Sequence, residues 1–308
     1  MKKKTTNTQE SEKKYKANWK EKIKPYLYIA PAFVGIGLFT IYPVIKVLIW
    51  SFQKVNQLDT SKTKWVGMKN YSYLISNSAF QKTLLNTLIY TGGTLAIIMT
   101  CALILAFWLN KSQGHLTIFT QGAAFMPHVI SSVSIALVFS MMMNPSFGLF
   151  NKVLTAIGLP ASPWLTSSST AMPSVVGVAS WKAIGYYCLI IIGALQSISA
   201  SIYEAASLDK AGVGVTLRKI TIPMISPQLF FVIITMTIGS FKVFDTVRLL
   251  TDGGPNNATS VLVYYIYKQV FWESNIGRAC AAGIVLLILV GILTVIYFKL
   301  LSKRVHYQ

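Results

Sequence analysis

Six long apolar stretches, separated by polar segments, constrain the fold of this chain more than any other feature of the sequence. A helix needs about 20 predominantly apolar residues to cross a bilayer. Hydrophobic residues make up 53% of the chain and charged residues only 12%, a balance far from that of soluble domains. The sequence predicts an all-α integral membrane protein with one membrane domain over residues 25–302, and with transmembrane helices at about residues 26–50, 83–109, 117–143, 171–195, 228–249 and 276–301.

Prolines are expected to distort two of these spans, because a proline inside a helix removes a backbone hydrogen bond and clashes with the carbonyl four residues earlier. Pro43 is expected to kink the first span. Pro127 and His128 are expected to interrupt the third.

The positive charge of the chain is concentrated beside the first span. The formal net charge is +19, and nine lysines lie within residues 1–24. Basic residues next to a span mark its cytoplasmic side, and anionic membrane lipids are a better partner for such a tail than nucleic acid. We expect residues 1–24 to form a flexible cytoplasmic tail and residues 303–308 a second one. The chain would then be a multi-pass protein of the cell (plasma) membrane with both termini in the cytoplasm.

A polar segment, residues 199–226, lies between the fourth and fifth spans and is called the elbow here. Ser201 and Glu204 have the spacing of a capping box, in which each side chain closes a backbone N–H at a helix start. Gly212 and Gly214 are expected to end this helix through positive φ, which glycine adopts without steric cost. The sequence predicts a helix, a break and a second helix within a folded cytoplasmic loop.

Residues of the elbow also occur at a characteristic spacing: Tyr203, Glu204, Ala205, Ala206, Asp209, Gly212, Ile220 and Pro223. With this spacing the elbow resembles the "EAA" loop of permease subunits of binding-protein-dependent ABC importers. In that family the loop docks as a coupling helix into the cytoplasmic ATPase. The resemblance implies this coupling role for Tyr203, Glu204, Ala205, Ala206, Asp209 and Gly212. The alternative is that Glu204 and the alanines only start an amphipathic surface helix.

One residue departs from the family pattern. The family usually has glycine directly after the aspartate, and this chain has Lys210 there. We expect Gly212 to supply the turn instead.

The resemblance extends outside the elbow and covers most of residues 26–301. Residues of the first two external segments and the second span that resemble the family are Val66, Gly67, Asn70, Tyr71, Asn86, Thr87, Gly148, Asn151, Gly158, Leu159, Trp164 and Leu165. The end of the fifth span and its loop resemble the carbohydrate-importing (maltose and multiple-sugar) branch through Phe241, Phe244, Asp245, Thr251, Gly253, Gly254, Pro255 and Thr259. The resemblance implies the fold of a type I ABC importer permease.

The sequence lacks the motifs of an enzyme. No G-x-x-x-x-G-K-[ST] segment occurs, so ATP hydrolysis would belong to a partner subunit. The three cysteines and three histidines are scattered without ligand spacing, which predicts neither a metal site nor another cofactor. An intramembrane enzyme would need a nucleophile or metal set that the sequence does not supply.

Polar residues at membrane depth are costly and therefore indicate either function or helix packing. A sugar path needs hydroxyl, amide and aromatic partners. Similarity to sugar-importer permeases implies that the path is lined by His128, Ser132, Ser180, Lys182, Tyr186, Gly239 and Lys242. As alternatives, the small residues only pack helices, His128 bonds to backbone freed by Pro127, and a lysine pairs with Asp245 or extends to the membrane surface.

These observations together predict the transmembrane permease subunit of an ATP-driven carbohydrate importer for an oligosaccharide or glycoside, working by alternating access. The resemblance implies a second homologous permease, a cytoplasmic ATPase dimer, an extracytoplasmic solute-binding protein and a sugar substrate. A glycerol phosphate ester or other polar solute is the alternative cargo. A proton-coupled secondary transporter is the rival from another class, and it would require intramembrane carboxylates and inverted repeats.

Overall fold

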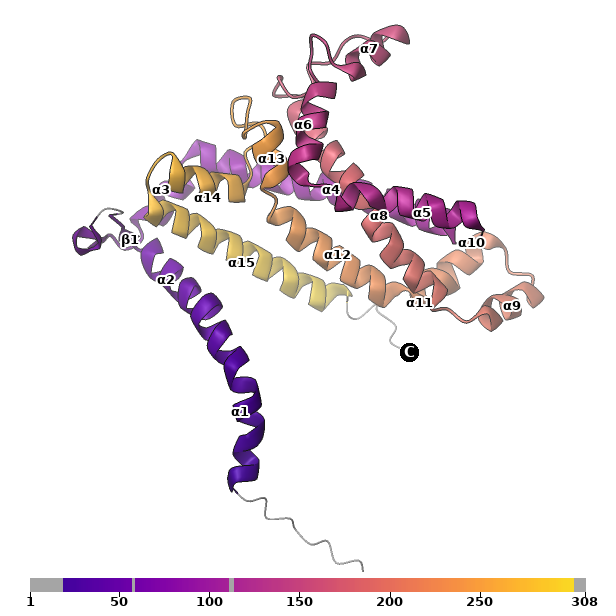
Figure 1. The fold of residues 1–308 in the computed structure, drawn as a ribbon, viewed down its shortest axis with the longest axis horizontal. Coiled ribbons are helices and arrows are strands. Elements are labelled where there is room, and N and C mark those ends of the chain that lie inside the picture. The colour runs from indigo at the N-terminus through magenta and orange to yellow at the C-terminus, as the bar shows by residue number, and fades with distance from the viewer. Residues whose placement is uncertain (1–18, 57–58, 111–113, 302–308) are drawn as a thin grey trace, which may run out of the picture. The chain divides into compact units, whose positions relative to one another are not determined.

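The computed structural model describes residues 19–56, 59–110 and 114–301 (Figure 1). These residues are predominantly helical, as predicted, with one short antiparallel hairpin of β1 (Gln53–Lys54) and β2 (Lys64–Trp65). The internal contacts divide the chain into two units, with the boundary between Val47 and Leu48. Most of the predicted basic tail lies outside the described residues, as does the C-terminal tail, whereas residues 19–24 are helical.

The first unit is helical and leads into the second. It contains α1 (Trp19–Ile36), a wide π turn (Gly37–Ile41) and the start of α2 (Tyr42–Ser51). The kink expected at Pro43 is replaced by this wide turn, through which the helix continues. A π turn inserts a residue and so relieves the clash between a proline ring and the preceding carbonyls. A second π turn (Leu217–Thr221) also ends two residues before a proline, Pro223.

Four helices are long and apolar enough to cross a membrane, and two bent helix pairs bring the total to six if each pair is one span. The four are Ile23–Ser51, α4 (Ser78–Leu109), α8 (Ala171–Gln196) and Ile276–Lys299 of α15 (Ile276–Leu301). The bent pairs are α5 (His115–Val129) with α6 (Ser132–Met142), at 95°, and Val213–Met224 with α12 (Ser226–Phe241), at 68°.

The third apolar stretch breaks later than the sequence predicted. Pro127 lies inside α5, and the chain bends at Ile130 and Ser131 instead. Ile130 has extended backbone angles, and the Ser131 hydroxyl accepts a hydrogen bond from the backbone N–H of Val133 at the start of α6. The cap at Ser131, rather than the proline, therefore fixes the position of the bend.

The fifth apolar stretch is not one helix over 228–249. α12 ends at Phe241, and α13 begins after a short break, at Asp245 (Asp245–Leu250). Asp245 stands in the first turn of α13, where a carboxylate is favourable near the helix N-terminus. The spacing of Gly239, Lys242 and Asp245 would place them on one face of a continuous helix, but the break separates Asp245 from the other two.

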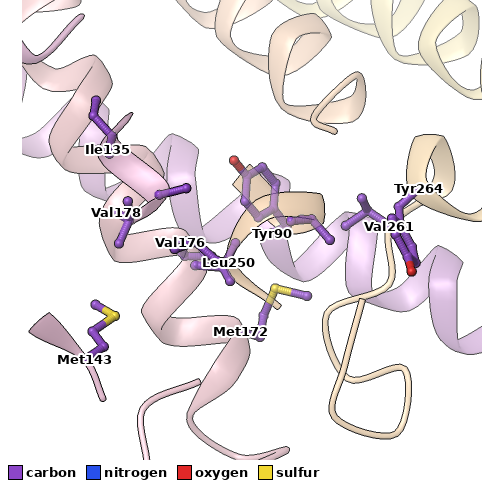
Figure 2. Packing of buried hydrophobic residues seen from close by; sticks show 12 residues of the cluster. Tyr90, Ile135, Met143, Met172, Val176, Val178, Leu250, Val261 and Tyr264 are labelled. Atoms are coloured by element: carbon purple, nitrogen blue, oxygen red, sulfur yellow. The ribbon is translucent and has the colours of Figure 1, made fainter. Parts of the chain in front are cut away.

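The main core of the second unit lies where α4 and α8 pack together. Figure 2 shows Tyr90 of α4 beside Val176 of α8, with Leu250 of α13 close by. These side chains are buried and form one cluster with Val261. The cluster fixes α13 and the following loop against the two long helices.

The helices α4 and α15 begin near the short helices α3 (Lys69–Ser76) and α14 (Leu262–Phe271), whereas α7 (Leu149–Ala156) contacts α6 (Figure 1). Asparagine side chains organise the segments around these helices. The Asn151 amide donates to the carbonyls of Pro145 and Ser162, and its oxygen accepts from the Ser162 backbone N–H and the Trp164 indole. The Asn70 amide donates to the carbonyls of Ser51 and Gln53. The family-like asparagines therefore shape loops.

The loop after α13 is held on α4 by side chains of that helix. The Asn86 amide donates to the carbonyls of Asn257 and Ser260, at 2.8 and 3.0 Å. Thr87 Oγ1 accepts from the Leu262 backbone N–H at 3.0 Å, and Lys82 donates to a loop carbonyl. These bonds join segments more than 170 residues apart in sequence.

Candidate functional site: the elbow and the polar cluster at the α5–α6 bend

The elbow contains α9 (Ala200–Leu208), α10 (Val213–Thr216), the second π turn and α11 (Ile222–Met224). The predicted order of helix, break and helix is present, but the predicted capping box is not. α9 begins at Ala200 after an extended Ser199, so Ser201 already lies within the first turn. The Ser201 hydroxyl is hydrogen-bonded to the Ser199 hydroxyl at 2.9 Å, and the predicted cap is wrong because the helix starts before Ser201.

Lys210, not Gly212, makes the turn that ends α9. Its φ is +53°, while Gly212 has φ −65° and ψ 155° and stands in front of α10. The Ala211 N–H bonds to the Ala206 carbonyl and the Lys210 N–H to the Ser207 carbonyl, both at 3.0 Å. This is the hydrogen-bond pattern of a left-handed helix end. Lys210 therefore adopts the left-handed conformation at the position where the family usually has glycine.

Replacing Lys210 with glycine is expected to stabilise the elbow. A left-handed conformation costs a residue with a Cβ about 1 kcal/mol, and glycine avoids most of this cost. The Lys210→Gly variant should show slower hydrogen exchange at the amides that close the α9 end. The control Ala211→Gly, next to it, should show equal or faster exchange, and the same slowing in both variants would contradict the assignment.

The two sides of α9 differ in burial. Ala206 is buried, and Tyr203 packs against the apolar cluster that joins α4 and α8, with its hydroxyl 3.3 Å from Thr221 Oγ1. On the opposite side, Glu204 and Ala205 are exposed, and the Leu208 side chain is 83% exposed. Tyr203 and Ala206 thus attach α9 to the helices, while Glu204, Ala205 and Leu208 form a free face, called the elbow face here.

Apolar exposure continues beyond α9. Val213, at the start of α10, is 82% exposed, and Asp209 and Gly212 are exposed between the two helices. Asp209 therefore lies on the free side of the elbow with Leu208 and Val213. Large apolar side chains exposed on a charged, water-facing segment are characteristic of a protein-binding surface.

Four of the seven predicted path residues lie together at the α5–α6 bend, where these helices face α8. The Lys182 ammonium donates to Ser132 Oγ at 2.6 Å. The His128 ring stacks on the Tyr186 ring with 4.4 Å between centroids and 11° between planes. We call His128, Ser132, Lys182 and Tyr186 the bend cluster. It offers an ammonium, a hydroxyl and an exposed aromatic pair, which are suitable partners for a polyhydroxylated ligand.

The close contact between α5 and α8 that forms the bend cluster depends on Gly185. A Cβ at this position would overlap the carbonyl group of Ala124. The sequence prediction did not identify Gly185, and only its place one residue before Tyr186 could have indicated it.

The other three predicted path residues lie elsewhere. Gly239 lines a separate cavity of about 170 Å³ between α4, α8 and α12. Ser180 is 1% exposed, and its hydroxyl has no hydrogen-bond partner among the described residues. Lys242 is exposed at the C-terminus of α12.

The cavity beside Gly239 includes polar residues that sequence reasoning missed. Thr94 of α4 and Ser240 of α12 are hydrogen-bonded at 3.1 Å within its lining, beside Tyr90 and Tyr187. Tyr90 and Thr94 are four residues apart, and this helical spacing of polar side chains in an apolar stretch was the available signal.

The lysines of the predicted path have no carboxylate partner in the part of the chain that the structure describes. Within the described residues no group of histidine, cysteine and acidic side chains could hold a metal ion. Ion pairs there join Lys62 to Asp59 and Arg248 to Asp252, and neither involves Asp245. The alternative in which a path lysine pairs with Asp245 is therefore not found among these residues.

Comparison with known proteins identifies the family. The model of the family "Binding-protein-dependent transport system inner membrane component" matches residues 92–307. The chain is 36% identical over 282 residues to the probable ABC transporter permease protein YurN of Bacillus subtilis (strain 168), covering 90% of this chain and 96% of YurN. It is 32% identical over 284 residues to the arabinooligosaccharides transport system permease protein AraP of the same organism, covering 92% of this chain and 90% of AraP.

A solved structure shows the same fold. A chain of a bacterial ABC transporter involved in the import of the acidic polysaccharide alginate superposes with a TM-score of 0.81 at 24% identity, covering 92% of this chain and 98% of that chain. The predicted resemblance and fold are confirmed by these comparisons. The protein is accordingly a membrane protein and belongs to the family of inner membrane components of binding-protein-dependent transport systems.

Proposed function

We propose that the chain is a permease subunit of an ATP-driven carbohydrate importer, with an oligosaccharide or glycoside as cargo. Family membership supports a transport role, and its relatives include proteins described as permeases for arabinooligosaccharides and for lactose. The chain itself catalyses no reaction in this proposal, and a partner hydrolyses ATP.

The main support for a partner ATPase is the exposed elbow face. Leu208 and Val213 are more than four-fifths exposed although they are apolar, while Tyr203 and Ala206 hold the same segment on the helices. A groove in a cytoplasmic ATPase would bury this face. Glu204, Ala205 and Leu208 would then contact the ATPase, with Asp209 and Gly212 beside them.

The proposal includes three kinds of partner. A second homologous permease completes the pore, two ATPase copies dock on the two elbows, and an extracytoplasmic binding protein delivers the sugar. A solved neighbour of this chain comes from an alginate transporter in complex with a periplasmic protein, which supports this last partner. ATP binding would draw the elbows together and turn the path outward. Both termini would be cytoplasmic, in agreement with the nine lysines of residues 1–24.

The bend cluster forms part of the sugar path in this proposal. Tyr186 and His128 present aromatic faces, and Lys182 and Ser132 present polar groups. Gly239 and its cavity, Ser180 and Lys242 remain candidates for further positions along the path. Their places on different helices fit a path between α4, α8 and α12 better than a single compact site.

Replacing Lys182 with leucine is expected to weaken sugar uptake through KM. In the proposed path the Lys182 ammonium would donate to a sugar hydroxyl, and hydrogen bonds to charged groups contribute about 1.5–3 kcal/mol, so loss of this bond should raise KM at least about tenfold. Uptake kinetics in cells or proteoliposomes would measure it. Ser132→Ala is the control, because it removes the bond between Lys182 and Ser132 but keeps the ammonium group. Unchanged uptake kinetics of Lys182→Leu at normal expression would show that Lys182 only packs between the helices.

Co-purification and uptake together test the whole proposal. The tagged protein should bring down a protein with a Walker motif, and uptake should stop without ATP. Uptake that persists without ATP but collapses with the proton gradient would establish the secondary transporter instead. A glycerol phosphate ester is the second candidate cargo, because a relative is named as an sn-glycerol-3-phosphate permease. Binding measurements on the cognate binding protein would distinguish the two cargoes.

A further inference from the structure

Three lysines gather around a hollow on the β1–β2 hairpin. The hollow has a volume of about 890 Å³, and its lining includes Lys54, Lys62, Lys64, Ser61 and Ser274. Lys54 and Lys64 stand directly opposite each other on the two strands. Like charges at such a position destabilise a hairpin, and a bound anion would offset this repulsion.

The described residues supply only part of such a counter-charge. Asp59 forms an ion pair with Lys62 at 3.2 Å. Hydrogen bonds from Ser61 and then from Lys62 lower the pKa of the Asp59 carboxyl below its ordinary value, so Asp59 is ionised at neutral pH. Within the described part of the chain, Lys54 and Lys64 have no ion-pair partner.

The hairpin that carries these lysines is held against α3 and the start of α15. The Asn70 amide donates to the Gln53 carbonyl at 3.0 Å, and a Cβ at Gly277 would overlap that same carbonyl group. The Phe52 and Trp65 rings stack with 5.7 Å between centroids. The hollow is therefore a shaped site whose lysines are presented by a fixed backbone.

The hollow lies beside the ends of two candidate membrane spans. Lys54 follows the end of one candidate span, Ser51, by three residues, and Ser274 precedes the start of another, Ile276, by two. Trp65 is 66% exposed on the same hairpin. Tryptophan at the end of a span is enriched at the level of the lipid headgroups on both sides of a membrane.

From this combination we infer that the hollow binds the phosphate of an anionic phospholipid, with Lys54 and Lys64 as the cationic contacts and Ser274 as a hydroxyl donor, since the Ser61 hydroxyl already donates to Asp59. The site lies on the opposite side of the spans from the elbow, and neither the transport cargo nor the ATPase takes part in it. An acidic protein surface is the other class of partner that lysines attract. The nearness of two span ends and the exposed Trp65 favour the lipid.

The test uses the full-length transporter complex, purified from a membrane and re-equilibrated in mixed micelles with equal parts of phosphatidylglycerol and phosphatidylcholine. Native mass spectrometry measures the retained lipids. Each lysine near an anionic surface contributes about 1 kcal/mol, a factor of about five, so the double variant Lys54→Gln, Lys64→Gln should lose about 25-fold of its preference for phosphatidylglycerol. The matched control Lys69→Gln, Lys152→Gln removes the same charge from exposed positions on α3 and α7 and should keep the preference.

Two further arms identify the ligand. The double arginine variant at positions 54 and 64 retains the charge and should retain the lipid, and inorganic phosphate should not displace phosphatidylglycerol. Equal lipid preference in the glutamine variant and its control would overturn the inference. Displacement by inorganic phosphate alone, or loss of binding-protein association with unchanged lipid retention, would also overturn it, in favour of a general anion site or an acidic protein partner respectively.

Discussion

Replacing Gly185 with alanine is expected to force α5 and α8 apart and to lower the free energy of unfolding by at least about 1–3 kcal/mol. The added Cβ would overlap the backbone carbonyl group of Ala124. A backbone group cannot rotate away as a flexible side chain does, so the two helices must move apart. That movement would also separate Tyr186 from His128. Thermal unfolding of the purified variant in detergent would measure the loss, and uptake should fall with it.

The matched control for this change lies on the same helix. A Cβ at Gly177 of α8 would meet no atom within 4 Å. Gly177→Ala should therefore leave stability unchanged or raise it by about 0.5–1 kcal/mol, as expected when glycine is replaced inside a helix. Equal unfolding temperatures for the two variants would show that the close approach at Gly185 does not hold the helices in place.

Replacing Leu208 with aspartate is expected to abolish coupling to the ATPase without unfolding the chain. The Leu208 side chain is 83% exposed, so the change costs little within the permease itself. In the proposed complex it would leave a carboxylate buried in the ATPase groove. Loss of a central interface residue of this kind costs about 2 kcal/mol or more, which is at least about 30-fold in association. Pull-down of the ATPase and ATP-driven uptake would both report it.

Leu149→Asp provides the comparison, because Leu149 is also more than half exposed but stands on α7, far from the elbow in sequence and predicted to lie outside the cell. It should keep ATPase association. Glu204→Lys reverses a charge on the elbow face and should weaken association as well. Normal association in Leu208→Asp would contradict docking at the elbow face.

The sequence was sufficient for the fold class and for the family, because both depend on long-range patterns of composition and motif. An apolar stretch such as 171–195 has few stable alternatives to a helix in a membrane. The elbow was also recognisable from spacing alone. Its internal geometry was not: the left-handed residue is Lys210, because the hydrogen bonds that end α9 fall at that position regardless of where glycine stands.

The candidate path was predictable only in part. Lys182 and Tyr186 share a helix face by spacing, and the sequence showed this. Their partners Ser132 and His128 depend on where the third stretch bends, and a cap at Ser131 decides that rather than Pro127. The separation of Gly239 from Lys182 follows from the packing of α12 against α4, which no local pattern specifies.

The attachment of the external loop to α4 limits how such a protein can open. Asn86 and Thr87 bind three backbone groups of the loop, and each buried polar group left without its partner would cost about 1–3 kcal/mol. Parting this loop from α4 during each cycle would therefore be slow as well as costly. The loop and α4 must therefore move together as one rigid body, and an outward-facing opening in this subunit has to form between other elements.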